Sequence, residues 1–332
     1  MKEYDVFGVG NALVDTEFEV TEDFLGEQGI EKGCMTLLDR DGYQSLFKIL
    51  RQRYDARTQS GGGSAGNSMY ALTQFGGKAF YSCRVANDTV GEYFLRELGS
   101  NNIETSRHLK TTGISGQCLI MVTPDAERTM NTYLGVSADL SINEIDLEAA
   151  KKSEYVYIEG FLVSSDSAKD AILKLKSCAS NSKVKVALTF SDPAVVTHFK
   201  EDIDDVLAGG VDLLFCNEEE LKIWANSANF EEACSQLSKV AKQFAVTRGA
   251  NGAILFDGNK YITIAPQTVT AINTNGAGDM FAGAFLYGIT QNFDFTIAGN
   301  FASLASAQVV TQFGPRLNSI KHSELKAKGL KG

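Results

Sequence analysis

Histidine and cysteine are scarce in this sequence, and the few that occur are not arranged as a metal site. Among 332 residues there are three histidines and six cysteines, with no CxxC pair and no histidine near a cysteine. Structural zinc is therefore not expected. Each histidine lies in a polar segment, where a solvated role is expected: His108, His198 and His322.

Long apolar segments are also missing. No uninterrupted apolar run approaches the ~20 residues that span a bilayer. The first residues, Met-Lys-Glu-Tyr-Asp-Val-Phe, lack the apolar stretch of a signal peptide. We therefore expect a cytoplasmic protein with reduced thiols and no membrane partner.

Positive charge is in short supply. The chain has 31 Lys and Arg against 41 Asp and Glu, a formal net charge of -10 at pH 7 and an isoelectric point near 5.0. A duplex nucleic acid would be repelled by this charge. The one basic cluster, from Lys321 to Lys331, is expected to be a short solvated terminus. We expect no nucleic-acid partner, although backbone N–H groups could still bind an anionic co-substrate such as ATP.

The residues that are present follow the pattern of an α/β fold with one main core and a smaller appendage. After residue 137, β-prone runs at 155–158, 184–188 and 211–216 alternate with helical segments. Such alternation predicts a central, mostly parallel sheet with helices on both faces, which is a Rossmann-like architecture.

Other strands are predicted to form a small β lid inserted into this core. Polar and apolar residues alternate over 15–20 and 34–38, as in strands with one wet face. Two further β-like runs, 116–123 and 128–134, are joined by turn residues. The predicted boundaries are 11–40 and 109–136 for the lid, and 1–10, 41–108 and 137–332 for the nucleotide-binding core.

The strongest motif is Asn273-Thr-Asn-Gly276-Ala277-Gly278-Asp279, directly before an apolar helix. Its glycines permit a tight turn whose N–H groups converge at a helix N-terminus, where a phosphoryl group could bind. Asp279 could then accept a proton from a substrate hydroxyl, with the helix dipole favouring its ionised form. The alternative is that Asp279 merely caps the helix.

A second motif, Asn217-Glu-Glu-Glu220, lies where a strand is expected to end and a helix to begin. Asn217 and Glu220 match the capping box, and capping alone would explain them. They could also hold waters around a magnesium ion that bridges nucleotide phosphates, because magnesium keeps much of its hydration shell.

The run Gly61-Gly62-Gly63-Ser-Ala-Gly66-Asn67 nearly matches a phosphate-binding P-loop. Asn67 stands where the lysine must be, so a Walker-type ATPase is not expected. A flexible turn is one interpretation. Alternatively, the glycines let a sugar approach the backbone while Asn67 exchanges hydrogen bonds with its hydroxyls.

Two more segments admit a simple and a functional interpretation. Asp15 could be a solvated strand residue, or its carboxylate could hold two vicinal hydroxyls opposite the Gly62-Gly63 loop. The segment from Thr247 through Gly249 could be a turn between strands, or it could line the ATP phosphates. A dinucleotide fingerprint fails because Leu13 occupies its third glycine position.

Together these motifs resemble the ribokinase-like (PfkB) family of carbohydrate and nucleoside kinases. Its two signature regions are similar to Gly61–Gly76 and Asn273–Phe285, and Asn217 and Glu220 fall between them in the expected order. The segments 10–15, 122–130 and 158–162 look most like the adenosine-kinase branch.

The resemblance implies a role for each matching residue. Asp279 would be the catalytic base, with the Gly276, Ala277 and Gly278 amides as anion hole. Asn11 and Asp15 would bind ribose hydroxyls, with Gly62, Gly63 and Asn67 around the sugar. Phe161 would lie near a base and Arg128 would close onto the phosphates. Asn217, Glu220, Thr247, Gly249 and Asn300 would serve ATP, with Glu220 reaching Mg2+ through water.

The resemblance also leaves choices open. The family usually has Asp at position 273, where it helps hold a monovalent cation, so Asn273 puts cation activation in doubt. The expected activity is transfer of phosphate from ATP to a hydroxyl of an adenosine-like nucleoside. The alternatives are a kinase of ribose, fructose or a keto-deoxy sugar acid, and a non-catalytic nucleotide- or sugar-binding protein. The chain could be a monomer or a homodimer.

Overall fold

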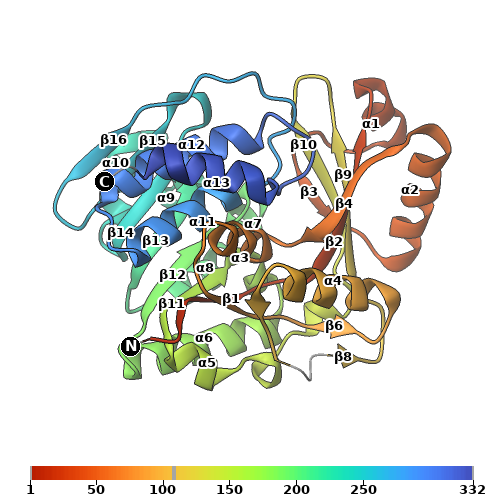
Figure 1. Ribbon diagram of the computed structural model, residues 1–332. Helices are drawn as coiled ribbons and strands as arrows, with labels where there is room; N and C mark the ends of the chain where they lie inside the picture. The colour runs from red at the N-terminus through yellow and green to blue at the C-terminus, as the bar shows by residue number, and fades with distance from the viewer. Residues whose placement is uncertain (1, 107–109, 331–332) are drawn as a thin grey trace.

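The structure, a computed structural model, describes residues 2–106 and 110–330. A large sheet with helices on both faces lies beside a smaller sheet (Figure 1). The large sheet has the order β16-β15-β14-β13-β12-β11-β1-β5-β7. Neighbours from β14 to β7 are parallel, whereas β15 and β16 are added antiparallel. The predicted fold class is confirmed.

The strands of the large sheet are short and apolar, as expected for strands covered on both faces. Their bounds are β1 (Tyr4–Val9), β5 (Ala79–Ser82), β7 (Ile103–Glu104), β11 (Ser153–Glu159), β12 (Lys185–Thr189), β13 (Val211–Asn217), β14 (Ala241–Thr247), β15 (Ala253–Phe256) and β16 (Tyr261–Ile264). A separate pair, β6 (Val85–Ala86) and β8 (Lys110–Thr111), lies beside them.

Two hydrophobic cores lie on opposite faces of the large sheet, each sealed by its own helices. The first core is covered by α3 (Ser64–Gln74), α4 (Thr89–Ser100), α11 (Ala277–Thr290), α12 (Phe295–Val309) and α13 (Ser319–Gly329). The second is covered by α5 (Leu147–Lys151), α6 (Asp166–Asn181), α7 (Pro193–His198), α8 (Lys200–Leu207), α9 (Glu218–Ala225) and α10 (Phe230–Leu237). Among the described residues no helix is long and apolar enough to cross a membrane.

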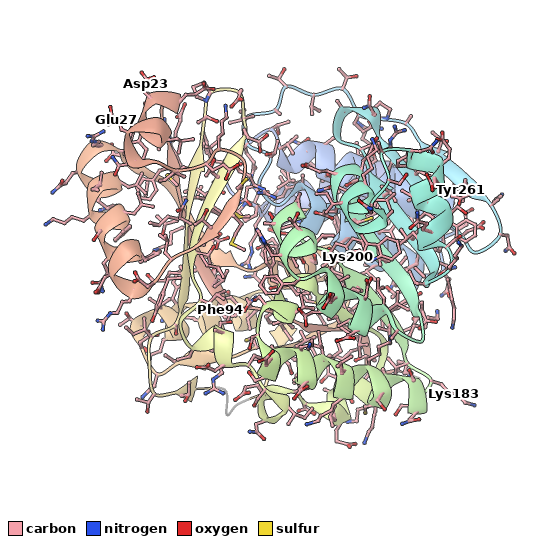
Figure 2. The ribbon with its side chains drawn as sticks, turned by 180° about the vertical axis from the view of Figure 1, so that it is seen from behind. Asp23, Glu27, Phe94, Lys183, Lys200 and Tyr261 are labelled. Carbon is pink, nitrogen blue, oxygen red and sulfur yellow. The ribbon has the colours of Figure 1, made fainter. Side chains whose placement is uncertain are left out.

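The smaller sheet, which we call the lid, has the order β3-β10-β9-β2-β4. Its strands are β2 (Leu13–Glu19), β3 (Met35–Leu37), β4 (Ala56–Gly62), β9 (Gly116–Val122) and β10 (Arg128–Tyr133). The outer face packs on α1 (Glu22–Gln28) and α2 (Arg40–Arg53). Figure 2 shows α1, which carries Asp23 and Glu27, on the outside of the lid. The inner face is therefore left for the space between the two sheets.

The predicted lid boundary at residue 40 was wrong. Strand β4 lies within the range 41–108 assigned to the core, yet it pairs antiparallel with β2 as an edge strand of the lid. Its sequence, Ala-Arg-Thr-Gln-Ser-Gly-Gly, has a single β-branched residue, Thr58, and no run of apolar residues that would identify a strand. The strand forms because its backbone completes the hydrogen bonding of β2.

The basic tail is also more ordered than predicted. Residues 319–329 form α13, which buries Leu325 and His322 against the first core, while Lys331 lies outside the described residues. Burial lowers the pKa of His322 to about 4, so a solvated role for this histidine was wrong. His198 is exposed, as predicted, and His108 lies outside the described residues.

Candidate active site

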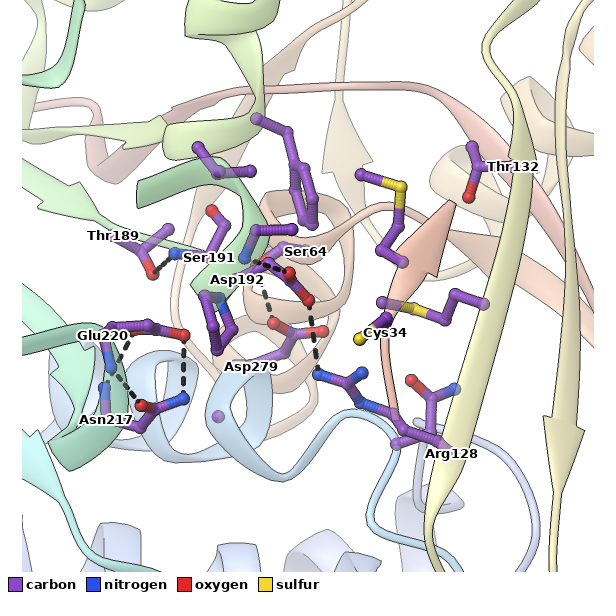
Figure 3. A pocket seen from close by; sticks show the side chains of 18 of the residues that line it. Cys34, Ser64, Arg128, Thr132, Thr189, Ser191, Asp192, Asn217, Glu220 and Asp279 are labelled. Atoms are coloured by element: carbon purple, nitrogen blue, oxygen red, sulfur yellow. Dashed lines mark hydrogen bonds and ion pairs between the residues drawn. The ribbon is translucent and has the colours of Figure 1, made fainter. Parts of the chain in front are cut away.

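A cavity of about 770 Å³ separates the large sheet from the inner face of the lid. The parallel strands end at this cavity, and four of their last residues line it: Glu159 of β11, Thr189 of β12, Asn217 of β13 and Thr247 of β14. Ligands of open α/β sheets bind at such carboxyl ends, and the volume suits a small organic ligand. Figure 3 shows the side chains converging there from both sheets.

All but two of the predicted site residues line this one cavity, although they are spread from residue 11 to residue 279. They are Asn11, Asp15, Gly63, Asn67, Arg128, Phe161, Asn217, Glu220, Thr247, Gly249, Gly276, Ala277, Gly278 and Asp279. The exceptions are Gly62, which lies behind Asp15, and Asn300, which is exposed on α12 away from the cavity lining. The predicted place of Asn300 near the adenine thus has no support from the cavity.

Asp279 lies in the first turn of α11 at the base of the cavity. Its carboxylate accepts hydrogen bonds from Ser64 Oγ at 2.7 Å and Asn67 Nδ2 at 3.0 Å. Burial raises the pKa of Asp279, while those two bonds and the charges of Arg128 and Arg316 oppose the rise. A carboxylate with a raised pKa, held by donors and facing a cavity, is suited to accept a proton.

The glycine turn before Asp279 forms the N-terminus of α11. Gly276 is the N-cap of α11 with φ 76°, and a Cβ there would lie 2.5 Å from Pro315 Cβ, so only glycine fits. A Cβ on Gly278 would meet nothing within 4 Å, so the turn is open toward the cavity. The Ala277 N–H donates to Thr274 O at 3.3 Å, so it is partly used within the turn.

Glu17 of the lid binds the segment that leads into this turn. Its fully buried carboxylate accepts hydrogen bonds from Asn273 Nδ2 at 3.1 Å, Asn275 Nδ2 at 2.7 Å, Gly314 N at 2.6 Å and Thr58 Oγ1 at 3.3 Å. Burial raises the pKa of Glu17 and these donors oppose the rise. The Glu17 carboxylate needs a hydrogen-bond donor at position 273, and the Asn273 amide supplies one. This is a structural reason for Asn at this position.

The wet face predicted for residues 15–20 was also wrong. Glu17 and Asp15 are both buried, and only Glu19 of this strand is exposed. Asp15 faces the cavity and Glu17 faces the turn before α11, so their alternation with apolar residues reflects a buried polar site rather than solvent.

Asp15 is a buried acidic residue on the lid's inner face. Among the residues that the structure describes, none donates a hydrogen bond to its carboxyl group, which lines the cavity. A Cβ on Gly62 would collide with this carboxyl group, so glycine is needed behind it. Burial and then the charge of Glu17 raise the pKa of Asp15 to about 8, against the opposing charge of Arg316. The group is thus poised to receive hydroxyl donors from a ligand.

Asn11 is held beside Asp15 by a buried carboxyl group, Glu159. Glu159 Oε1 accepts from Asn11 Nδ2 at 2.8 Å and from Asn11 N at 3.1 Å, and its Oε2 accepts from Ala65 N at 2.9 Å. Asn11 Oδ1 accepts from Ser137 Oγ at 3.0 Å. Burial raises the pKa of Glu159 to about 7. Glu159 therefore joins the start of the lid to the start of α3.

Asn217 and Glu220 form the capping box of α9 and also line the cavity. Asn217 N and Nδ2 donate to Glu220 at 2.9 and 2.8 Å, and Glu220 N donates to Asn217 Oδ1 at 2.8 Å. Burial raises the pKa of Glu220 to about 8. Among the described residues no group of three or more His, Cys, Asp or Glu could hold a metal directly. The site fits magnesium only through water, because magnesium commonly keeps part of its hydration shell.

Arg128 reaches across the cavity from the lid strand β10. Its guanidinium lies 4.0 Å from the carboxylate of Asp192, the N-cap residue of α7 (Figure 3). The lid turn makes a second contact, because Ala126 O accepts from Thr274 N at 3.1 Å. With Glu17, these contacts hold the lid against the core on both sides of Asp279.

The apolar residues of the lid are divided between its outer face and the cavity. Leu119 and Met121 are buried on the outer face against α1 and α2, so they cannot contact a ligand. Leu37 does line the cavity, and the other apolar or sulfur-containing lid residues there are Leu13, Met35, Cys118, Met130 and Leu134. Phe161, half-buried in the 3-10 turn after β11, faces them from the core.

Several site residues were missed from the sequence. Ser64 follows the predicted glycine loop, and Asp192 precedes Pro193 at a helix start, a capping signal that could have been noticed. Glu17 and Arg316 had no such signal, because Asn273, the partner of Glu17, and Asn67, the partner of Arg316, lie more than two hundred residues away from them in the chain.

Comparison with known proteins agrees with this architecture. The family described as pfkB family carbohydrate kinase matches residues 34–322. A probable sugar kinase from Rhizobium etli CFN 42 is 31% identical with a TM-score of 0.93, covering 99% of this chain and 100% of its own. The adenosine kinase of Sinorhizobium meliloti is 31% identical with a TM-score of 0.91, covering 98% and 99%. The adenosine kinase of Saccharomyces cerevisiae is 24% identical over 95% of this chain and 97% of its own.

Proposed function

The chain belongs to the pfkB family of carbohydrate kinases, which are phosphotransferases with an alcohol group as acceptor, and we propose that it transfers phosphate from ATP to a hydroxyl of a nucleoside. One observation carries the proposal. The Asp279 carboxylate lies in the first turn of α11, beside an open glycine turn and at the base of a ligand-sized cavity. An acceptor hydroxyl and a phosphoryl group could meet there.

In this mechanism the protein positions the reactants and moves one proton. Asp279 accepts the proton of the acceptor hydroxyl as the phosphoryl group is transferred. Main-chain N–H groups at the start of α11 stabilise the developing negative charge. Arg128, carried by the lid, adds positive charge opposite them, and the lid excludes water that would otherwise hydrolyse ATP.

The phosphates of ATP would extend along the carboxyl ends of β13 and β14. Thr247 and Gly249 line this part of the cavity, and Asn217 and Glu220 would hold a hydrated magnesium ion beside them. Magnesium, when bound, neutralises charge on the phosphates. Asn273 is committed to Glu17, so we propose no monovalent-cation site at this position.

The acceptor part of the cavity is apolar on two sides and acidic at one end. The apolar lid residues face Phe161 across it, which suits a flat base, and Asp15 suits two vicinal hydroxyls. The apolar walls favour a nucleoside over a free sugar, whereas the vicinal hydroxyls that Asp15 suits occur in both. A sugar kinase is the second candidate, and it is favoured by the 31% identity to the probable sugar kinase.

An acceptor panel tests the proposed function. The purified protein is given ATP and magnesium with adenosine, other nucleosides, ribose, fructose and a keto-deoxy sugar acid, and ADP release is followed. We expect the best nucleoside to exceed every sugar by at least ~10-fold in kcat/KM, because only a nucleoside fills the apolar walls. A higher value for a sugar would assign a sugar kinase, and no ADP release with any acceptor in the panel would favour a binding protein.

The raised pKa of Asp15 predicts pH-dependent acceptor binding. The pKa is about 8 in the free protein, so the carboxyl group is largely protonated at neutral pH. A hydroxyl donor favours the ionised form, so KM should fall by up to about tenfold per pH unit as the pH rises toward 8 and level off above it. Initial rates between about pH 6 and pH 9 measure this, with Asp15→Asn as the control that should have a high, pH-independent KM. A flat KM in the unmodified protein would contradict the assignment.

A further inference from the structure

Arg316 is a buried cation next to the active site that the mechanism above does not use. Its side chain is only 7% exposed, and its guanidinium lies 4.8 Å above the ring of Tyr70. Nη1 contacts Glu97 at 3.3 Å, and Nε donates to Asn67 Oδ1 at 3.0 Å. A buried guanidinium is costly to desolvate, and these three contacts offset part of that cost while fixing the direction of Nε–H and Nη1–H; among the described residues Nη2 has no hydrogen-bond partner.

The contact with Arg316 determines which way the Asn67 amide points. A guanidinium N–H can only donate, so the Asn67 atom that faces Nε must be the carbonyl oxygen. The amide nitrogen then faces Asp279, where it donates to Oδ2 at 3.0 Å. With the amide reversed, two donors would face each other at Arg316 and two acceptors at Asp279. Arg316 therefore ensures that a donor is presented to Asp279.

We propose that Arg316 is a positioning residue for the proposed phosphotransfer, acting on Asp279 through Asn67. The inference rests on the proposed function and deepens it, because it names what keeps Asp279 ionised and correctly oriented. It also changes the role predicted for Asn67. The Asn67 carbonyl oxygen accepts from Arg316 and its amide nitrogen donates to Asp279, so the primary role of Asn67 is to orient the base rather than to bind a sugar hydroxyl.

Other groups act on Asp279 as well, and they define what the test must separate. Arg128 from β10 adds a second positive charge, and Ser64 from α3 donates a second hydrogen bond. The buried acids and phenols that interact with Asp279 are Asp15 of β2, Glu159 of β11, Tyr157 of β11 and Tyr81 of β5. Unlike these groups, Arg316 is linked to Asp279 through the side-chain amide of Asn67.

The first test follows the nuclear magnetic resonance signal of the Asn67 side-chain amide and does not depend on catalytic turnover. In protein labelled with 15N-asparagine, the Asn67 carboxamide signal is identified by its loss in Asn67→Ser and followed against pH. Its titration should report Asp279 and vanish in Asp279→Asn. In Arg316→Met the midpoint should rise by about one pH unit, the size expected when a carboxylate loses a hydrogen bond and a nearby cation.

A double-mutant cycle separates the relay from a simple charge effect. If Arg316 acts through Asn67, then Arg316→Met should move the acidic limb of the kcat profile in the Asn67 background but by less than half as much in Asn67→Ser. Equal shifts in both backgrounds would overturn the relay. Arg316→Lys keeps the charge but lacks the planar Nε–H, so it should also raise the midpoint, and it replaces Arg316→Met if that variant does not fold. An unshifted midpoint in Arg316→Lys would overturn the orienting role.

A distant arginine supplies the matched control. Arg84 contacts Glu144 at 3.0 Å and the Asp139 carbonyl at 2.9 Å, outside the cavity lining. Arg84→Lys should leave both the Asn67 signal and the kcat profile unchanged. If no acceptor is phosphorylated by the unmodified protein, the proposed function fails while the nuclear magnetic resonance titration still decides the relay.

Discussion

Asp279→Asn is expected to lower kcat by at least ~10² while acceptor affinity stays within about threefold of the unmodified protein. Asparagine keeps the shape of the side chain, and its carbonyl oxygen can still accept from Ser64 or Asn67. What it lacks is the capacity to take a proton from the acceptor hydroxyl. The loss should therefore appear in kcat and not in binding.

Steady-state rates with the best nucleoside measure the first quantity, and calorimetric titration of the same nucleoside measures the second. Ser64→Ala is the matched control, because it removes a donor to Asp279 but leaves the base in place. Its kcat should lie between those of Asp279→Asn and the unmodified protein. Turnover of Asp279→Asn within a few-fold of normal would remove Asp279 as the base.

Asn273→Asp should destabilise the protein by about 3 kcal/mol at neutral pH, because it places a second carboxylate against the buried Glu17. The pair must then share a proton, so at least one native pKa rises above its unfolded value. The unfolded state loses this proton near pH 4 while the native state retains it. The destabilisation should therefore grow as the pH rises from about 4 toward the raised native pKa.

Urea unfolding at about pH 5.5 and pH 8 would measure this difference, with the larger loss expected at the higher pH. The compensating variant is Glu17→Gln combined with Asn273→Asp, which exchanges the amide and the carboxylate. The exchange should recover part of the lost stability, since the amide introduced at position 17 can donate to the carboxylate introduced at position 273, while Gly314 and Asn275 still need an acceptor. A double variant less stable than Asn273→Asp alone would contradict the proposed donor–acceptor arrangement.

The parts of the fold that were predictable are those whose determinants are local. Strands such as β11 and β13 are short apolar runs, and α11 follows a glycine turn, so a window of a few residues is enough to identify them. Asn217 and Glu220 were found for the same reason, because a capping box is complete within four residues.

The parts that were missed depend on partners far away in the chain. Strand β4 is polar and glycine-rich, and it becomes a strand only by pairing with β2. Leu119 and Met121 belong to a correctly predicted strand, yet the sequence does not say which of its two faces meets the cavity.

The site shows the same division. Asp279 and its glycine turn carry their own signal, whereas Glu17 and Arg316 look like ordinary surface charges in the sequence. Each gains its role through bonds to a segment on another layer: Glu17 to Asn273, and Arg316 to Asn67. Contacts of this kind are decided by tertiary packing, which local propensity does not encode.

The ion pair between Arg128 of the lid and Asp192 of the core allows the lid to cover the cavity before a nucleotide binds. When a lid carries a guanidinium into a cavity, the guanidinium loses water, and this desolvation costs free energy unless an anion lies beside it. Asp192, 4.0 Å away, supplies a resident counterion. A polyphosphate that binds would then replace Asp192 as the anion beside Arg128. When the polyphosphate leaves, Arg128 would pair with Asp192 again.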